Sequence, residues 1–443
     1  MGDQPTSRDR TTPRAVAPGV VIGSALEWFD FYLYASMAAL VFGRVFFPSV
    51  DGAAGTLASF ATFAVGFLAR PIGGVVFGHL GDRIGRKATM SLTFSVMGVS
   101  TGLIGLLPSY DAIGIAAPIL LVVFRILQGA GAGAEWTTAT VLAYEHAKAG
   151  RKGRAGSLSA LGVNIGLLAS SLCVAALTSM DQAALDSWGW RIPFLASFVL
   201  LGLGIYVRSR VPETPEFEKV EHVTQRRSTV EALRAMLRSD WRGVAVVLVV
   251  TLGYNGATYT YKTFSLTYLQ EFRDVPASIG AFGVTLASAA AIVAVPIAGR
   301  LCDLVDAKWI ILGGGAGMVA MAFPFFTLLD TGANGYIWLA LILTTGLIMP
   351  FTLAACGSFW SRQIAPDVRS LGFAVGREFG GAFAGGLVPL LALTLVTVSD
   401  TSSTWGVSLL FVLCGVFVVG GVAMDQTRQV RERAVAEPVA GRT

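Results

Sequence analysis

The sequence has 443 residues, of which 54% are hydrophobic and only 14% are charged, and its formal net charge is +5. A soluble domain carries about 25% charged residues, because its surface must face water. This composition therefore excludes an ordinary soluble protein and favours a chain with much of its surface in lipid. The 52 glycines fit that interpretation, since small residues let helices pack closely inside a membrane.

Several classes of function are not indicated by the motifs. The basic residues recur in short loops rather than in one patch, so nucleic-acid binding is not expected. The four cysteines are scattered and show no CxxC or CxxH spacing, so neither a metal site nor a disulfide framework is expected. A GxxxxGK[ST] nucleotide loop does not occur. We therefore expect a protein that is not an enzyme and that needs no metal, cofactor or nucleotide.

Twelve apolar runs are each long enough to cross a bilayer, which takes about 20 residues of helix. In chain order they lie at 18–46, 55–80, 88–107, 114–144, 156–178, 189–208, 243–269, 278–300, 308–329, 334–360, 370–397 and 405–424. The sequence therefore predicts an all-α membrane protein with twelve transmembrane helices.

The one long polar stretch divides these helices into two sets of six. We expect an N-terminal tail over 1–17, a first six-helix half over 18–208, a linker over 209–242, a second half over 243–424 and a C-terminal tail over 425–443. Two such halves are expected to be pseudo-symmetric and to enclose a central cavity.

Basic residues in the loops predict the orientation. If the N-terminus is cytoplasmic, the cytoplasmic loops and tails hold 26 of the 33 Lys and Arg residues, and the opposite loops hold only Arg44 and Arg273. Basic residues concentrate on the cytoplasmic side of membrane proteins. We therefore expect a multi-pass protein of the cytoplasmic (inner) membrane with both termini in the cytoplasm.

A repeated motif relates the two halves. The string GHLGDRIGRK follows the second span at 78–87, and GRLCDLVDAK follows the eighth at 299–308. The first glycine, the aspartate and the final lysine coincide in the two strings. A repeat at the equivalent place in each half is expected of a duplicated six-helix unit.

The string at 78–87 resembles the loop signature of the major facilitator superfamily. Its longer context resembles the metabolite–proton symporter branch, whose members carry α-ketoglutarate, shikimate, citrate or proline and betaine. The matching strings are EWFDF at 27–31, LARPIGG at 68–74, RILQG at 125–129, WGWRIPF at 188–194 and PETPEF at 212–217. The second half matches more loosely and departs at Arg377 and Glu378, where the resemblance leads us to expect uncharged residues.

This resemblance implies that the loop motif acts as a cytoplasmic gate. The residues concerned are Gly78, Asp82, Arg83 and Arg86, with Asp303 as the counterpart of Asp82 in the second half. Glycines permit a tight turn, and the charged groups can pair between helix ends. The alternative is a plain orientation signal, because basic residues gather on this side in any case.

Three carboxylates within spans are candidates for proton coupling. Glu27 and Asp30 lie three residues apart and so share one face of the first span, and Glu135 lies in the fourth. An ionisable group inside a membrane is costly and marks a functional site by default. Asp30 is the first candidate for the proton carrier. The alternative is a fixed ion pair with an arginine of a neighbouring span.

Two arginines within spans, Arg70 and Arg125, are candidates for substrate binding. A guanidinium group stays charged and offers a planar fork to a carboxylate. The alternative is structural pairing of Arg70 with Asp30 and of Arg125 with Glu135. Arg377 is a further candidate from the second half. Because Arg377 and Glu378 are adjacent, about 100° apart around a helix, we expect them to reach different neighbours.

Uncharged polar residues add to the predicted cavity. Asn255, Tyr259 and Lys262 form an i, i+4, i+7 stripe on the seventh span, and Asn164 lies in the fifth between two glycines. The stripe is expected either to line the cavity or to form a hydrogen-bonded seam between helices.

The resulting functional hypothesis is secondary transport by alternating access, with symport of protons and a small organic acid or zwitterion. The expected partners are the small-molecule substrate, protons and the lipid bilayer. The alternatives are efflux by proton antiport and, with less support, a transporter-derived sensor.

Overall fold

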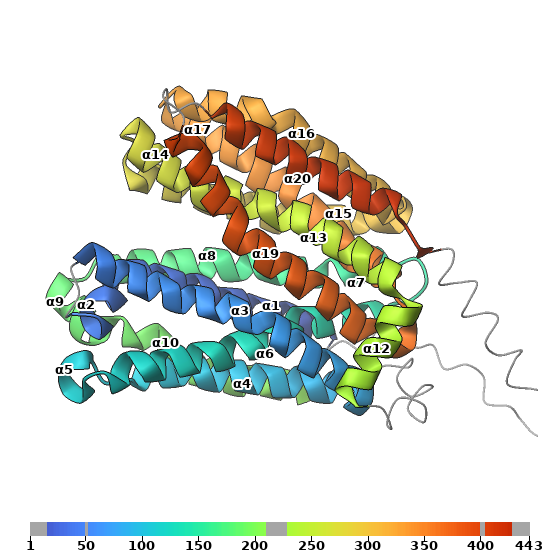
Figure 1. Ribbon diagram of the computed structural model, residues 1–443, viewed down its shortest axis with the longest axis horizontal. Helices are drawn as coiled ribbons and strands as arrows, with labels where there is room; N and C mark the ends of the chain where they lie inside the picture. The colour runs from blue at the N-terminus through green and yellow to red at the C-terminus, as the bar shows by residue number, and fades with distance from the viewer. Residues whose placement is uncertain (1–15, 49–51, 210–227, 399–403, 428–443) are drawn as a thin grey trace, which may run out of the picture.

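The computed structural model describes residues 16–48, 52–209, 228–398 and 404–427, and no strand occurs within these ranges. The chain forms two helical bundles that lie side by side (Figure 1). The expected tails, apart from residues 16–17 and 425–427, and the linker residues 210–227 lie outside the described ranges. The all-α fold predicted from the sequence is confirmed.

The first bundle contains every helix that precedes the linker. Its helices, with π-helical turns marked η, are α1 (Val16–Met37), η1 (Ala38–Phe42), α2 (Gly43–Phe46), α3 (Gly52–Ile84), α4 (Arg86–Leu106), α5 (Tyr110–Ile113), α6 (Ala116–His146), α7 (Lys152–Gly156), α8 (Leu158–Thr178), α9 (Gln182–Ala184), η2 (Leu185–Gly189) and α10 (Arg191–Ser209).

The helix α12 (Thr229–Ser239) lies in the linker, and the second bundle follows it. This bundle contains α13 (Trp241–Tyr259), η3 (Thr260–Phe264, π), α14 (Ser265–Arg273), α15 (Ala277–Leu304), α16 (Ala307–Asp330), α17 (Asn334–Leu341), η4 (Ile342–Ile348, π), α18 (Met349–Trp360), η5 (Pro366–Val368, 3₁₀), α19 (Arg369–Thr397) and α20 (Trp405–Ala423).

Within the described ranges, ten helices are long and apolar enough to cross a membrane, and the first span, bent by 43° between Met37 and Leu40, makes an eleventh. The remaining predicted span, 370–397, corresponds to α19, which is helical throughout although it carries Arg377 and Glu378. Each of the twelve predicted spans is thus a helix, in the predicted order.

The structure adds detail at the linker and at the seventh span. The linker was expected to be a polar stretch up to residue 242, but it contains α12, which begins with a capping box in which Ser228 and Glu231 satisfy each other's backbone amides. The helical segment of the seventh span continues to Arg273, beyond residue 269. In the seventh span, polar residues thus extend the helix past the apolar run that the sequence pattern detects.

Glycines let helices of the first half approach one another closely. Gly133 of α6 lies against the backbone of Arg70 in α3, and Gly129 lies in the same way against Gly66. A side chain at Gly133 would collide with the Arg70 carbonyl oxygen. The same kind of contact joins α8 to α1, where Gly166 lies against Ala25. In a membrane the hydrophobic effect does not drive helices together, so close van der Waals contacts of this kind stabilise the helix pairs.

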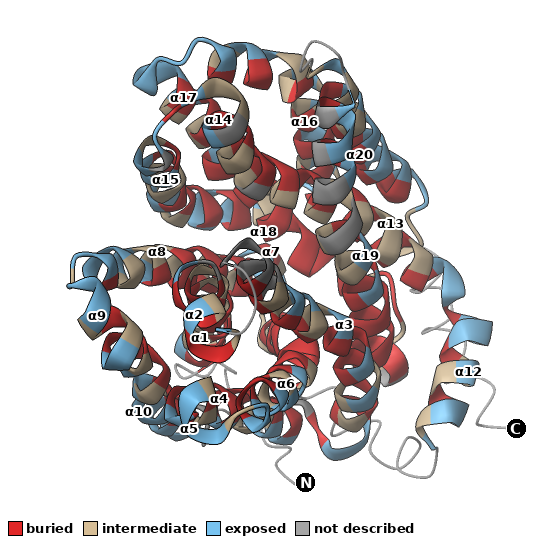
Figure 2. Cartoon of the chain, turned by 60° about the vertical axis from the view of Figure 1, so that its left-hand side comes forward, coloured by how far each residue is buried: buried red, intermediate tan, exposed pale blue. Residues whose placement is uncertain are grey.

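The outer faces of the bundles are apolar. Leu68 and Ile72 of α3 are each 67% exposed, and Val199 of α10 is 75% exposed. In Figure 2 the buried residues follow the helix faces that turn toward other helices, and the exposed ones face outward. Lipid is the solvent that such a surface requires.

The two bundles are not parallel to each other. Their ribbons come together at the end that carries α7 and α12 and diverge toward the end that carries α5 and α14 (Figure 1). We call these the linker end and the far end. At the interface α3 packs on α19, and α8 packs on α15.

Candidate functional site

A cavity lies between the two bundles. Its walls come from α1, α6 and α8 on one side and from α13, η3, η4, α18 and α19 on the other. The lining residues are Trp28, Tyr32, Trp136, Val163, Asn164, Thr251, Tyr254, Asn255, Thr258, Tyr259, Lys262, Thr345, Met349, Pro350, Leu353, Trp360 and Arg377.

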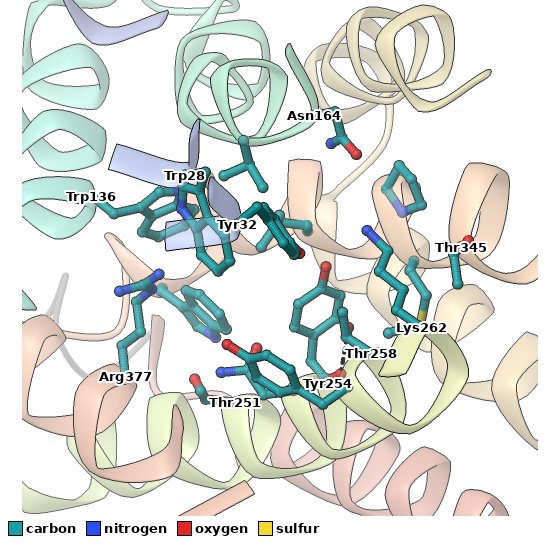
Figure 3. A pocket seen from close by; sticks show the side chains of 17 residues that line it. Trp28, Tyr32, Trp136, Asn164, Thr251, Tyr254, Thr258, Lys262, Thr345 and Arg377 are labelled. Atoms are coloured by element: carbon teal, nitrogen blue, oxygen red, sulfur yellow. Dashed lines mark hydrogen bonds between the residues drawn. The ribbon is translucent and has the colours of Figure 1, made fainter. Parts of the chain in front are cut away.

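Five of the residues that the sequence suggested for substrate binding line this cavity: Asn164, Asn255, Tyr259, Lys262 and Arg377. Lys262 and Arg377 lie on opposite sides of it (Figure 3). Arg70 and Arg125 are not among the residues that line it. The polar stripe on the seventh span therefore faces the cavity.

The aromatic wall of the cavity was missed by the sequence interpretation, which leaves Trp28 and Tyr32 outside the predicted site. The centres of the two rings are 5.7 Å apart on one face of α1, and both residues line the cavity. Their i, i+4 spacing was the available signal. In the second half Tyr254 extends the same wall (Figure 3).

Arg70 binds two carboxylates, one from each half. Its Nη2 donates to Glu27 Oε1 at 2.9 Å, and its Nε donates to Glu378 Oε2 at 2.8 Å. The second carboxylate oxygen of Glu378 accepts a hydrogen bond from Arg377. All four side chains are buried. We call these residues, which carry two positive and two negative charges, the interhalf ion network.

This network corrects two expectations. The alternative pairing of Arg70 with Asp30 is wrong, because the carboxylates of Glu27 and Glu378 occupy the guanidinium group of Arg70. The expectation that Arg377 and Glu378 would reach different neighbours is also wrong, because they pair with each other. The arginine side chain is long enough to turn back to the adjacent carboxylate. The Arg377 guanidinium also packs over the ring of Trp136, 4.4 Å from its centre.

Asp30 belongs to a second polar cluster, inside the first half. Thr101 Oγ1 donates to Asp30 Oδ2 at 2.8 Å, and Ser197 Oγ lies 3.2 Å from Oδ1. Thr101 also accepts a hydrogen bond of 2.7 Å from Gln128 Nε2. Asp30 thus receives its hydrogen bonds from hydroxyl groups.

Arg125 completes this cluster. Its Nη1 donates to Gln128 Oε1 at 2.5 Å, while Nε and Nη2 are buried without a hydrogen-bond partner. The guanidinium lies 4.1 Å from the centre of the Tyr34 ring and 4.5 Å from that of Phe31, so aromatic faces compensate part of its charge.

The alternative pairing of Arg125 with Glu135 is wrong, because each has another hydrogen-bond partner. The Thr93 hydroxyl of α4 donates to Glu135 Oε2 at 3.1 Å. The reason lies in the helix geometry, because ten residues along α6 place the two side chains nearly three turns apart.

The loop motif joins the halves at the linker end. Asp82 accepts hydrogen bonds from the backbone amides of Ser370 (3.3 Å) and Leu371 (3.0 Å), in the first turn of α19. A negative charge at a helix N-terminus is favourable, because the free amides and the helix dipole point toward it. Gly78 permits this approach, since a Cβ there would lie 3.1 Å from Leu371 Cα.

The second half repeats this arrangement in the opposite direction. Asp303 accepts from the backbone amides of Gly153 (2.8 Å) and Arg154 (3.3 Å) in α7, and from Arg154 Nε at 2.5 Å. A third contact also joins the two halves, since Arg369 Nη1 of α19 pairs with Glu145 Oε1 of α6 at 2.8 Å. We call Asp82, Asp303 and the Glu145–Arg369 pair the linker-end latch.

The other charged residues of the motifs lie differently. Arg83 is exposed, and the side chain of Arg86 lies outside the described residues. Asp306 begins α16 and pairs with Arg362 at 2.9 Å. Partial burial raises the pKa of Asp306, but the hydrogen bonds from Arg362 and from the Lys308 amide outweigh it and hold the pKa below its usual value.

Comparison with known proteins accounts for this architecture. The family model described as Major Facilitator Superfamily matches residues 20–389. The chain belongs to this superfamily. It is a multi-pass membrane transporter and not an enzyme.

Individual relatives agree with this assignment. The shikimate transporter of Escherichia coli K12 is 34% identical over 414 residues, which cover 93% of this chain and 94% of that protein. The proline/betaine transporter of the same organism is 31% identical, with 92% and 82% covered. The proton:xylose symporter XylE superposes with a TM-score of 0.68 at 16% identity, over 94% of this chain and 95% of that one, which shows the common fold.

Proposed function

We propose that the chain is a secondary active transporter that moves a small organic acid or zwitterion together with protons into the cytoplasm. The observation that carries this proposal is the cavity between the halves, which is lined by two cations and no carboxylate. A basic cavity attracts a carboxylate-bearing solute, and a co-transported proton offsets the charge. The relatives that bear the names of shikimate and proline/betaine transporters support the same substrate classes.

Alternating access is the mechanism of this proposal. The latch holds the halves together at the linker end, while they diverge toward the far end. The excess of basic residues on the linker side supports a cytoplasmic linker end, in a protein of the inner membrane. This conformation is then the outward-facing one, and rocking of the halves about the cavity delivers the substrate to the inside.

Asp30 is the proton carrier in this proposal. Its partners, the hydroxyl groups of Thr101 and Ser197, can donate to a carboxylate and can also accept from a protonated carboxyl group. Both protonation states therefore keep their hydrogen bonds. Glu27, in contrast, is fixed by its ion pair with Arg70.

Substitution of Asp30 tests proton coupling. In proteoliposomes with an inward-directed proton gradient, we expect Asp30→Asn to abolish uphill accumulation of the substrate but to retain exchange of internal for external substrate. The amide cannot take up or release a proton, whereas exchange needs no net proton movement. Uptake and exchange of a radiolabelled substrate measure the two activities.

The matched control is Asp111→Asn, in the exposed helix α5, which should leave both activities unchanged. Uphill accumulation by Asp30→Asn would exclude Asp30 as the carrier and direct attention to Glu27 and Glu135. Accumulation only under an outward-directed gradient would show efflux by antiport instead of symport.

A further inference from the structure

The amine of Lys262 is exceptional among the charged groups at the cavity. Lys262 lies in η3, a π-helical turn, and π turns within helices occur frequently at functional sites. In the part of the chain that the structure describes, its Nζ makes no hydrogen bond or ion pair. Figure 3 shows the amine directed into the cavity.

Arg377, the other cation of the cavity, is already neutralised. It pairs with Glu378 and packs over the ring of Trp136. Among the described lining residues, Lys262 therefore carries the only uncompensated charge. An ammonium group away from bulk water without a counter-charge is unfavourable, so a ligand that brings one negative charge would gain free energy by binding beside it.

The rest of the cavity fits the body of such a ligand. Asn164, Asn255 and Thr345 offer amide and hydroxyl groups, while Tyr32 and Tyr254 offer aromatic faces with a hydroxyl at the edge. No carboxylate among the lining residues could neutralise an ammonium group. A second carboxylate on the ligand would have to displace Glu378 from Arg377.

We propose that Lys262 binds the carboxylate of the substrate, and that the cavity selects a small monocarboxylate with a hydroxylated body over zwitterions and dicarboxylates. This inference rests on the proposed transport function and narrows its substrate class. Hydroxyl groups of the ligand would bond to the amides and hydroxyls of the wall, and its apolar face would lie against the tyrosines.

Calorimetry on the purified full-length protein tests this assignment. The probes are shikimate and quinate as hydroxylated monocarboxylates, glycine betaine and proline as zwitterions, and α-ketoglutarate as a dicarboxylate. We expect the monocarboxylates to bind most tightly. Lys262→Gln should weaken their binding roughly ten- to a hundredfold, the range of a hydrogen bond to a charged group. Lys262→Arg should keep it within a few fold. Lys308→Gln, outside the cavity, is the control and should change nothing.

Thermal unfolding without ligand separates binding from a structural role. Because the amine has no partner to lose, Lys262→Gln should melt at the wild-type temperature or above it. A melting point lower by many degrees, unchanged monocarboxylate affinity in the variant, tighter binding of a zwitterion or dicarboxylate, or no binding of either monocarboxylate would each overturn the assignment.

Transport by the wild-type protein distinguishes this inference from the proposed function. Proton-driven accumulation of a zwitterion, in preference to the monocarboxylates, would uphold the transport function and overturn the selectivity proposed for the cavity. Lys262-dependent binding of shikimate or quinate, without proton-driven transport of any probe, would uphold the binding site and overturn proton-coupled transport.

Discussion

The four charges of the interhalf ion network are the least expected feature at the level of single residues. Arg70 bonds to carboxylates from both halves, and Glu378 lies 308 positions away from it in the chain. The sequence shows that each of these groups must find a partner, because an isolated charge inside a membrane is costly. It cannot show which partner, because that depends on how the two halves pack.

Removal of Arg70 should destabilise the protein. Arg70→Ala leaves the carboxylates of Glu27 and Glu378 buried without their main counter-charge, which costs about 3–5 kcal/mol for a buried pair. Arg70→Lys should lie between wild type and alanine, because it keeps the charge but loses the planar fork. The melting temperature of purified protein in detergent measures these differences.

The control for this series is Arg44→Ala. Arg44 pairs with Asp186 at 2.8 Å, but its side chain is 55% exposed, and an exposed pair contributes about 0–1 kcal/mol. Equal melting temperatures for Arg70→Ala and Arg44→Ala would contradict the structural importance of the network.

At the level of helices, the predicted spans and their order were correct, because length and hydropathy determine them. The π-helical turns η1, η3 and η4 were not predicted, since a π turn has no compositional signal. The sequence predicted that helices pack closely, because it contains many glycines. It could not predict which helices pair, because it does not show which backbone each glycine faces.

Substitution of Gly133 tests the close contact between α3 and α6. A Cβ at this position collides with the Arg70 carbonyl oxygen, so Gly133→Ala must push the helices apart, at a cost of about 1–3 kcal/mol for overpacking. It should also displace Arg70 from its carboxylates. We expect a lower melting temperature and reduced transport.

Gly202→Ala in α10 is the matched control, because nothing lies within 4 Å of a Cβ there. This variant should melt at the wild-type temperature or slightly above it, since alanine is the better helix former. A Gly133→Ala protein as stable as Gly202→Ala would show that the α3–α6 contact tolerates a methyl group.

For the molecule as a whole, the sequence predicted the helical membrane fold, and the family model confirms the superfamily. Of the candidate site, the polar stripe of α13 and η3 could be predicted to face the cavity, because a helix keeps i, i+4 and i+7 on one face. Arg70 and Arg125 do not line the cavity. The sequence could not show this, because their positions depend on contacts between helices that are far apart in the chain.

The linker-end latch controls the whole molecule in the proposed mechanism. Asp82 and Asp303 each bond across the interface to backbone amides of the other half. A hydrogen bond to a charged group contributes about 1.5–3 kcal/mol. If the latch stabilises the conformation that is closed at the linker end, Asp82→Asn and Asp303→Asn should each lower the ratio of this conformation to the opposite one roughly ten- to a hundredfold.

Cysteine accessibility measures this shift. With the four native cysteines replaced, a Thr258→Cys probe in the cavity should react faster with an impermeant reagent from the cytoplasmic side in the latch variants than in the parent protein, and more slowly from outside. Asp330→Asn is the control, because Asp330 bonds to Tyr268 and Arg273 within the second half only. The direction of the shift is decisive. Faster labelling from outside would mean that the latch belongs to the conformation open toward the cytoplasm, and unchanged labelling from both sides would mean that these aspartates fix helix ends without biasing the transport cycle.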